Sequence, residues 1–98
     1  MAQFDVFLLR ESTYVVDVQS PLASVHGTRL VIPLIVPDHD ARQTTRLNPE
    51  LTFAGERRLL AIQFASTIDA GKLTTPVGSL AHEEWAIKGA IDFLISGF

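Results

Sequence analysis

Apolar runs separated by polar breaks fill most of the chain and predict short strands. Residues 3–9, 14–18 and 28–32 are each rich in Val, Ile, Leu, Phe or Tyr, which are typical strand residues. Pro33 follows the third run and predicts an edge position, a bulge or the end of that strand, because proline cannot donate to a sheet ladder. Residues 34–36 are apolar again and are expected to continue the strand after a bend.

The middle of the chain predicts a hairpin. Residues 51–53 form one arm, the Ala54-Gly55-Glu56 sequence forms the turn, and residues 58–64 form the other arm. Residues 66–72 are interpreted as a polar connection, and residues 73–77 as a last short strand.

The hydrophobic period changes after residue 79. Ile87, Ile91, Leu94 and Ile95 are spaced as i, i+4, i+7 and i+8, which places them on one stripe of a helix over residues 79–95. Gly97 follows the stripe at the usual position of a left-handed C-terminal cap. Strands followed by one helix predict a small α+β domain that is mostly β, spanning residues 1–98 as a single unit.

Composition narrows the class of protein. With 98 residues, 47% of them hydrophobic and 19% charged, the chain has too many apolar residues for a disordered protein. It has no cysteine, so disulfides and thiolate metal sites are excluded. A net charge of −3 lacks the basic balance that duplex binding favours, so no direct nucleic-acid binding is expected. No run is long enough to span a membrane and the start lacks a signal-peptide pattern, which predicts a cytoplasmic protein. A core this small favours a homodimer.

Three clusters of polar residues are candidate chemical sites. Asp38, His39 and Asp40 resemble metal ligands, but consecutive residues on one loop rarely converge on an ion, so a polar loop is the preferred interpretation. Thr28, Arg29 and Asp69 suggest a metal-free ribonuclease site, against the favoured interpretation of Arg29 as a strand residue facing water. His82-Glu83-Glu84 lacks the second histidine of a helical zinc site. No catalytic residue, metal ligand or cofactor is therefore predicted.

Apolar residues also occur where burial is least expected. Leu22 and Ala23 lie in the loop that begins at Ser20-Pro21, and residues 95–98 form the chain end. Apolar groups at such positions often mark an interface, with Phe98 folding back onto the core as the alternative.

Three segments of the chain form a recognisable set. They are Gln3-Phe4 at the first strand, the block Val16-Asp17-Val18-Gln19-Ser20, and the run from Arg29 to Leu34 that contains Ile32-Pro33. Together they resemble the CcdB toxins of bacterial toxin–antitoxin operons. The end of the chain, residues 87–98, is similar to the family's Ile-Lys-x-Ala-Ile helix with its near-terminal glycine. The resemblance implies a strongly bent antiparallel sheet of the Src-homology-like barrel type, shared by CcdB and Kid toxins, with a C-terminal helix.

The resemblance also implies a function. Family members are homodimers that bind the A subunit of DNA gyrase, trap the gyrase–DNA cleavage complex, and are neutralised by a CcdA-like antitoxin. The implied gyrase-binding residues are Leu22, Ala23, Asp92, Ile95, Ser96, Gly97 and Phe98, and the implied dimer interface contains Leu94 and Gly97. Where the family ends in Trp-Gly-Ile, this chain ends in Ser96-Gly97-Phe98.

Two alternatives remain open at this point. One is a messenger-RNA endoribonuclease of the sister branch of the fold, although the opening Gly-Asp element and the Arg-Pro pair typical of that branch are missing. The other is a decayed toxin that binds antitoxin and only represses its own operon.

Overall fold

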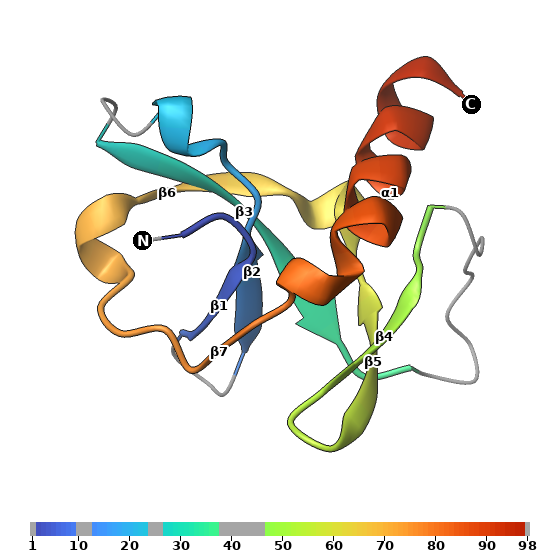
Figure 1. The fold of residues 1–98 in the computed structure, drawn as a ribbon, viewed down its shortest axis with the longest axis horizontal. Helices are drawn as coiled ribbons and strands as arrows, with labels where there is room; N and C mark the ends of the chain where they lie inside the picture. The colour runs from blue at the N-terminus through green and yellow to red at the C-terminus, as the bar shows by residue number, and fades with distance from the viewer. Residues whose placement is uncertain (1, 10–12, 24–26, 38–46, 98) are drawn as a thin grey trace.

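The computed structural model describes residues 2–9, 13–23, 27–37 and 47–97, which form a curled antiparallel sheet and one C-terminal helix (Figure 1). The strands are β1 Asp5–Leu8, β2 Tyr14–Asp17, β3 Thr28–Ile35, β4 Glu50–Phe53, β5 Glu56–Leu60, β6 Ser66–Asp69 and β7 Gly78–Ser79. Four 3-10 turns, η2 Pro21–Ala23, η3 Ile62–Phe64, η4 Ala70–Lys72 and η5 Ala81–Glu83, precede or join these elements and the helix α1 Glu84–Ser96. The predicted mostly β, α+β fold with a bent sheet is confirmed.

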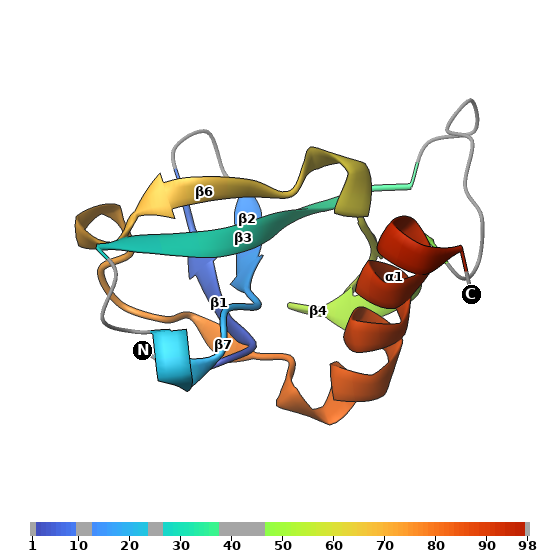
Figure 2. The same ribbon diagram turned by 90° about the horizontal axis from the view of Figure 1, so that it is seen from above.

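Strand β3 is the centre of the sheet. The strand order is β4-β5-β3-β2-β1-β7, and β6 also pairs with β3. One edge of β3 pairs with β2, while the other edge pairs first with β6 and then, after a bend, with β5. Figure 2 shows β6 lying along β3 while β4 diverges toward α1, so the sheet curls into a half-barrel.

Pro33 lies inside β3 rather than ending it. Val31 is the last partner of β6 and Leu34 is the first partner of β5, so Pro33 lies where β3 changes partner. Its carbonyl oxygen accepts a hydrogen bond from the amide of Ala61 at 2.9 Å. Since the missing N–H of proline falls in the gap between two partner strands, the sheet loses no ladder bond there.

Three other sequence expectations were wrong. The supposed polar connection over residues 66–72 contains β6 and η4, and the last strand is β7 rather than residues 73–77. The second arm of the hairpin ends at Leu60, where η3 follows after one residue. Strand β6 pairs only with β3 and remains mostly exposed, so its side chains are largely polar. That polar pattern is why the sequence predicted a connection instead of a strand.

Helix α1 follows the predicted stripe only in its first half. Ile87 and Ala90 are fully buried and Ile91 is half-buried, whereas Leu94 is 48% and Ile95 is 77% exposed. Figure 1 shows the C-terminal end of α1 projecting beyond the strands, which explains the rising exposure. Gly97 has a φ of 79° and its amide donates to the carbonyl of Phe93 at 2.8 Å, so the predicted left-handed cap is confirmed.

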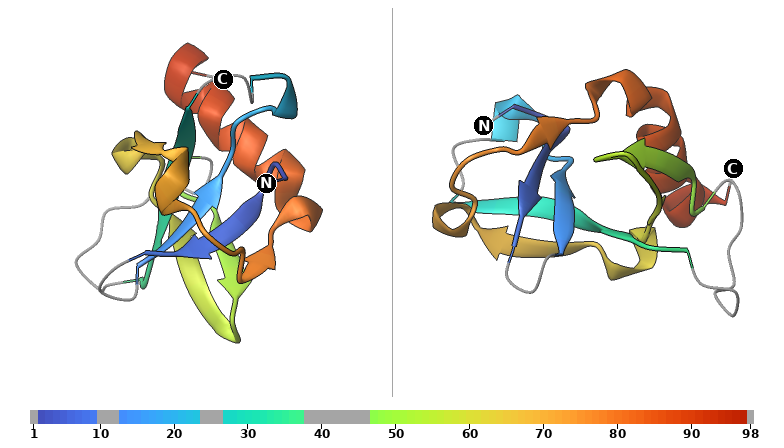
Figure 3. Two further views of the ribbon diagram at one scale, coloured as in Figure 1. Left: turned by 90° about the vertical axis from the view of Figure 1, so that its left-hand side faces the viewer. Right: turned by 90° about the horizontal axis from the view of Figure 1, so that it is seen from below.

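The sheet carries apolar residues on both faces, since side chains alternate along each strand. The larger core lies between the concave face and α1 and contains Val6, Val16, Ile32, Leu60, Leu80 and Ile87. A smaller core on the other face contains Phe7, Val15, Val31 and Leu73, with Leu9 and Ile68 packed against it. Figure 2 and the right-hand view of Figure 3 show the molecule from opposite sides, from above and from below.

Candidate functional site

The turn η2 presents the most exposed large apolar side chain among the described residues. Leu22 is 92% exposed, and Ala23 is half-buried. Ser20 organises the turn locally: its carbonyl accepts from the amide of Ala23 at 2.9 Å, and its hydroxyl accepts from the amide of Leu22 at 3.2 Å. The turn therefore has a defined conformation although none of its residues is buried.

A buried ion pair lies behind this turn. Arg29 on β3 is 2% exposed and Asp17 on β2 is fully buried, and their side chains meet at 2.8 Å. The interpretation of Arg29 as a residue facing water is therefore wrong. Both residues belong to the face of the sheet that carries Val15 and Val31, so the strands direct their side chains toward each other.

The ribonuclease constellation does not converge. Thr28 and Asp69 are directly opposed in the β3–β6 ladder, so their side chains share one face. Arg29 is the next residue along β3 and points to the other face, where Asp17 holds it. The Asp69 carboxylate accepts from the amide of Gly71 at 3.0 Å and acts as a local cap. A substrate phosphate cannot reach the Arg29 guanidinium and these two groups together.

The C-terminal end of α1 forms a second exposed surface. Asp92, Ile95, Ser96 and Gly97 are all exposed, and Leu94 is about half exposed. The turn η3, which packs against α1, adds an exposed aromatic residue, Phe64, at 61%. Phe98, named above for the same surface, lies outside the described residues.

The two surfaces are separate within one chain. In Figure 1 both η2 and the C-terminal end of α1 lie on the upper side of the molecule, and Figures 1 and 2 show them in opposite halves along its longest axis. The predicted site residues therefore form two groups, one on η2 and one at the end of α1, which do not meet within one chain. A partner that contacts both must bridge that separation or meet them on different copies of the chain.

Trp85 is an exposed aromatic residue that the sequence analysis did not single out. It is the only tryptophan of the chain and is 81% exposed, with Lys88 Nζ 5.9 Å from its ring centroid. Spacings of seven and eleven residues place it on the same side of α1 as Asp92 and Ser96. The sequence could have indicated that Trp85 is exposed, because it lies outside the apolar stripe of Ile87, Ile91 and Leu94.

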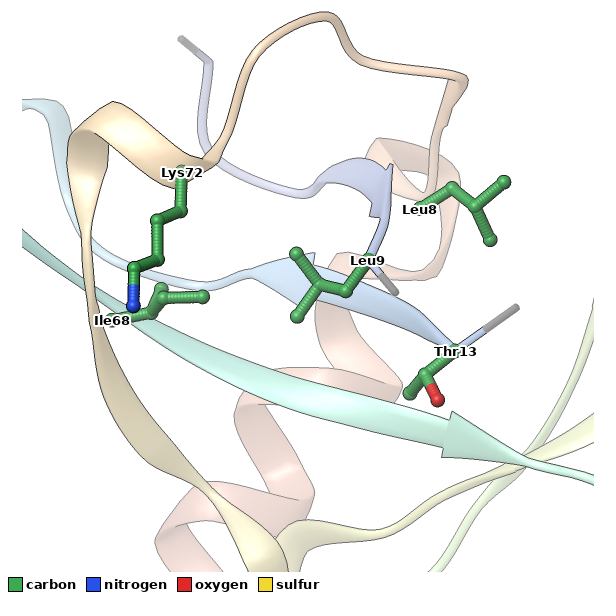
Figure 4. Close-up of a pocket in the computed structure, with 5 residues that line it drawn as sticks. All are labelled: Leu8, Leu9, Thr13, Ile68 and Lys72. Atoms are coloured by element: carbon green, nitrogen blue, oxygen red, sulfur yellow. The ribbon is translucent and has the colours of Figure 1, made fainter. Parts of the chain in front are cut away.

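A groove of about 680 Å³ opens at the rim of the smaller core, on the β1 and β6 side of the sheet. Figure 4 shows its lining side chains, Leu8, Leu9, Thr13, Ile68 and Lys72. The lining is mostly aliphatic with one cation, which suits an apolar group and offers no acid–base pair.

The described residues contain neither a metal-binding cluster nor a membrane-spanning helix. Among residues 2–9, 13–23, 27–37 and 47–97, no three His, Asp or Glu side chains gather in a way that could hold a metal ion. Asp38, His39 and Asp40 lie outside these ranges. In the same described part of the chain, no helix is long and apolar enough to cross a bilayer.

Comparison with known proteins shows which family the chain belongs to. No curated protein matches the chain. The family model described as CcdB protein matches residues 3–97, which includes every element of the sheet and the whole of α1. The strand order, the C-terminal helix with its glycine cap and this match over nearly the full length lead to one conclusion: the chain belongs to the CcdB family.

Proposed function

We propose that this protein is a gyrase poison: a toxin that binds the A subunit of DNA gyrase and stabilises the state in which gyrase holds cleaved DNA. As a member of its family the chain is a toxin of a toxin–antitoxin system. Gyrase as the target goes beyond what family membership gives, and the exposed apolar residues on η2 and at the end of α1 support it. Leu22 and Ile95, at 92% and 77% exposure, are the observation that carries the proposal.

The contact surface is formed by Leu22, Ala23, Asp92, Ile95, Ser96, Gly97 and Phe98. Large apolar side chains exposed to water are unfavourable unless a partner covers them, and burying one contributes about 1.5–3 kcal/mol. The left-handed conformation at Gly97 ends the helix and turns the backbone away from the helix axis.

The acting species is a homodimer whose interface includes Leu94 and Gly97. The apolar face of α1 continues past the strands, and Leu94 on that face stays about half exposed in the single chain. Packing two such helix ends around a two-fold axis covers Leu94 and places both copies of the end of α1 next to each other. The gyrase A subunits also occur as a pair, so the symmetry of the two partners matches.

The mechanism needs no catalytic residue. A protein that binds only the opened, DNA-cleaved conformer shifts gyrase toward that conformer by mass action. Moving the equilibrium from 1:99 to 99:1 requires about 10⁴-fold tighter binding to the favoured state. Two symmetric contacts of a few kcal/mol each are sufficient for a difference of this size. An antitoxin that covers part of the same surface would release gyrase.

The test is a plasmid cleavage assay with purified gyrase, ATP and the purified protein. Linear DNA should accumulate with the wild-type protein and should fall strongly with Leu22→Ser or Ile95→Ser. Val77→Ser is the matched control, because Val77 is 51% exposed but lies next to β7, away from both surfaces. Binding of antitoxin without any gyrase cleavage would instead identify a toxin that retains only its co-repressor role.

A further inference from the structure

We infer that Gln19, backed by the buried Asp17–Arg29 pair, is a positioning residue that holds η2 so that Leu22 projects toward its partner. The inference deepens the proposed function and rests on it for the identity of that partner. Gln19 is not itself a contact residue: it is half-buried and its polar groups all point into the protein.

The side-chain amide of Gln19 links β3 to η2. Its Nε2 donates to the carbonyl of Ala23 at 2.9 Å, and its Oε1 accepts from the amide of Leu30 at 2.9 Å. One side chain therefore joins the last residue of the exposed turn to the central strand of the sheet. No other side-chain hydrogen bond among the described residues ties η2 to a strand.

The backbone of Gln19 is held by both members of the ion pair. Its amide donates to Asp17 Oδ1 at 3.0 Å, and its carbonyl accepts from Arg29 Nη2 at 3.3 Å. Arg29 Nε also donates to Asp17 Oδ2 at 2.8 Å, so the carboxylate and the guanidinium orient each other. A buried pair of this kind contributes little net stability because of its desolvation cost, whereas it defines one geometry.

Hydrogen bonds hold η2 in position because the turn has little apolar packing. None of the three residues of η2 is fully buried and only Ala23 is half-buried, so apolar contacts anchor the turn weakly. An exposed leucine on a loosely held turn would lose conformational entropy when it binds, which weakens the complex. A turn that is already fixed by Gln19 avoids much of that loss.

The test compares Gln19→Leu with Gln3→Leu. Gln3 is a matched control because its Nε2 donates to the carbonyl of Val18 at 3.0 Å, a bond of the same type next to Gln19 that does not contact η2. Binding of a gyrase A fragment should weaken about tenfold in Gln19→Leu, which corresponds to about 1.4 kcal/mol, and change less than about twofold in Gln3→Leu. Thermal unfolding of both variants shows whether the fold is kept.

A double-mutant cycle with Leu22→Ala separates positioning from general damage. If Gln19 acts through Leu22, Gln19→Leu should have little further effect in the Leu22→Ala protein. Equal losses in both backgrounds would overturn the inference. So would wild-type affinity of Gln19→Leu for gyrase.

Amide hydrogen exchange at Leu22 and Ala23 gives a readout that needs no gyrase. Exchange should become faster in Gln19→Leu and stay unchanged in Gln3→Leu. If exchange becomes faster but even the wild-type protein binds no gyrase, the target is wrong and the positioning of η2 stands. If exchange is unchanged, Gln19 does not hold the turn, whatever the target.

Discussion

The ring of Phe53 on β4 lies directly against Gly78 on β7. A Cβ atom placed on Gly78 would be 2.6 Å from Cε1 and 2.7 Å from Cζ of that ring. Since β4 and β7 are the two ends of the strand order, this contact joins the two edges of the curled sheet. Tyr14 packs edge-on against Phe53 at 5.2 Å, and the Arg58 guanidinium lies 4.6 Å from the Tyr14 ring centroid. The half-barrel is thus closed by an aromatic contact rather than by strand pairing.

Replacing Gly78 with alanine should destabilise the protein by about 1–3 kcal/mol, because the Phe53 ring must move out of a packed position. Thermal unfolding monitored by circular dichroism measures the change. Gly89→Ala is the control, since Gly89 lies inside α1 with open space around its Cβ position, and it should stabilise by up to about 1 kcal/mol. A neutral Gly78→Ala would mean that the contact with Phe53 does not close the sheet.

Breaking the buried ion pair should be costly. Arg29→Met leaves the carboxylate of Asp17 buried without its cation, which should lower the free energy of unfolding by about 3–5 kcal/mol. Adding Asp17→Leu should recover much of that loss, because no unpaired charge remains. Urea denaturation of the two variants measures both effects. A double variant that is as unstable as Arg29→Met would show that the pair contributes more than charge compensation.

The turn of the β4–β5 hairpin contains a removable strain. Ala54 has a φ of 55° and is followed by Gly55 at 77°, a pair of positive values typical of a type I′ turn. Alanine is unfavourable there by about 1 kcal/mol, whereas asparagine is well tolerated. Ala54→Asn should therefore raise the melting temperature, and Ala54→Val should lower it. The same melting temperature for both variants would contradict the conformation of this turn.

The chain end should contribute toxicity and little stability. Ser96 and Gly97 are exposed and lie beyond the buried residues of α1, so truncation after Ile95 should leave the melting temperature within a few degrees. Growth inhibition in bacteria should be lost, and antitoxin binding should be kept. Gly97→Val should act similarly, because a β-branched residue resists a φ of 79°. A truncated protein that still inhibits growth would remove the end of α1 from the gyrase contact.

Trp85 offers a direct probe of the dimer geometry. As the only tryptophan and at 81% exposure, it should show the red-shifted emission and strong acrylamide quenching of a solvated indole. These properties should not change on dilution, since the proposed interface lies at the other end of α1. Emission that shifts to the blue at high concentration would place the dimer contact on the outer side of α1 near Trp85. Sedimentation at the same concentrations reports the oligomeric state independently.

The types of neighbouring residues and the spacing of apolar ones, which can be seen in the sequence, determined the β-rich pattern and the C-terminal helix. Aromatic Tyr14 and the β-branched Val15 and Val16 favour the strand Tyr14–Asp17. The stripe through Ile87 and Ile91 forms the buried side of α1. Gly97 caps the helix because only its backbone adopts the left-handed conformation without penalty. The family could also be recognised from the sequence, because the segments that resemble it lie next to β1, in and after β2, in β3 and in α1.

Tertiary structure alone decided which surfaces and which polar residues matter. Arg29 is buried because Asp17 lies on the neighbouring strand of the same face, a pairing that depends on the β2–β3 register. Residues Ser66–Asp69 form a strand because β3 offers them a free edge, although their own side chains are mostly polar and exposed. Leu94 and Ile95 continue the periodic stripe of α1 yet remain exposed, because the sheet ends before the helix does. Periodicity reports the spacing of apolar residues, whereas burial depends on what lies opposite them in space.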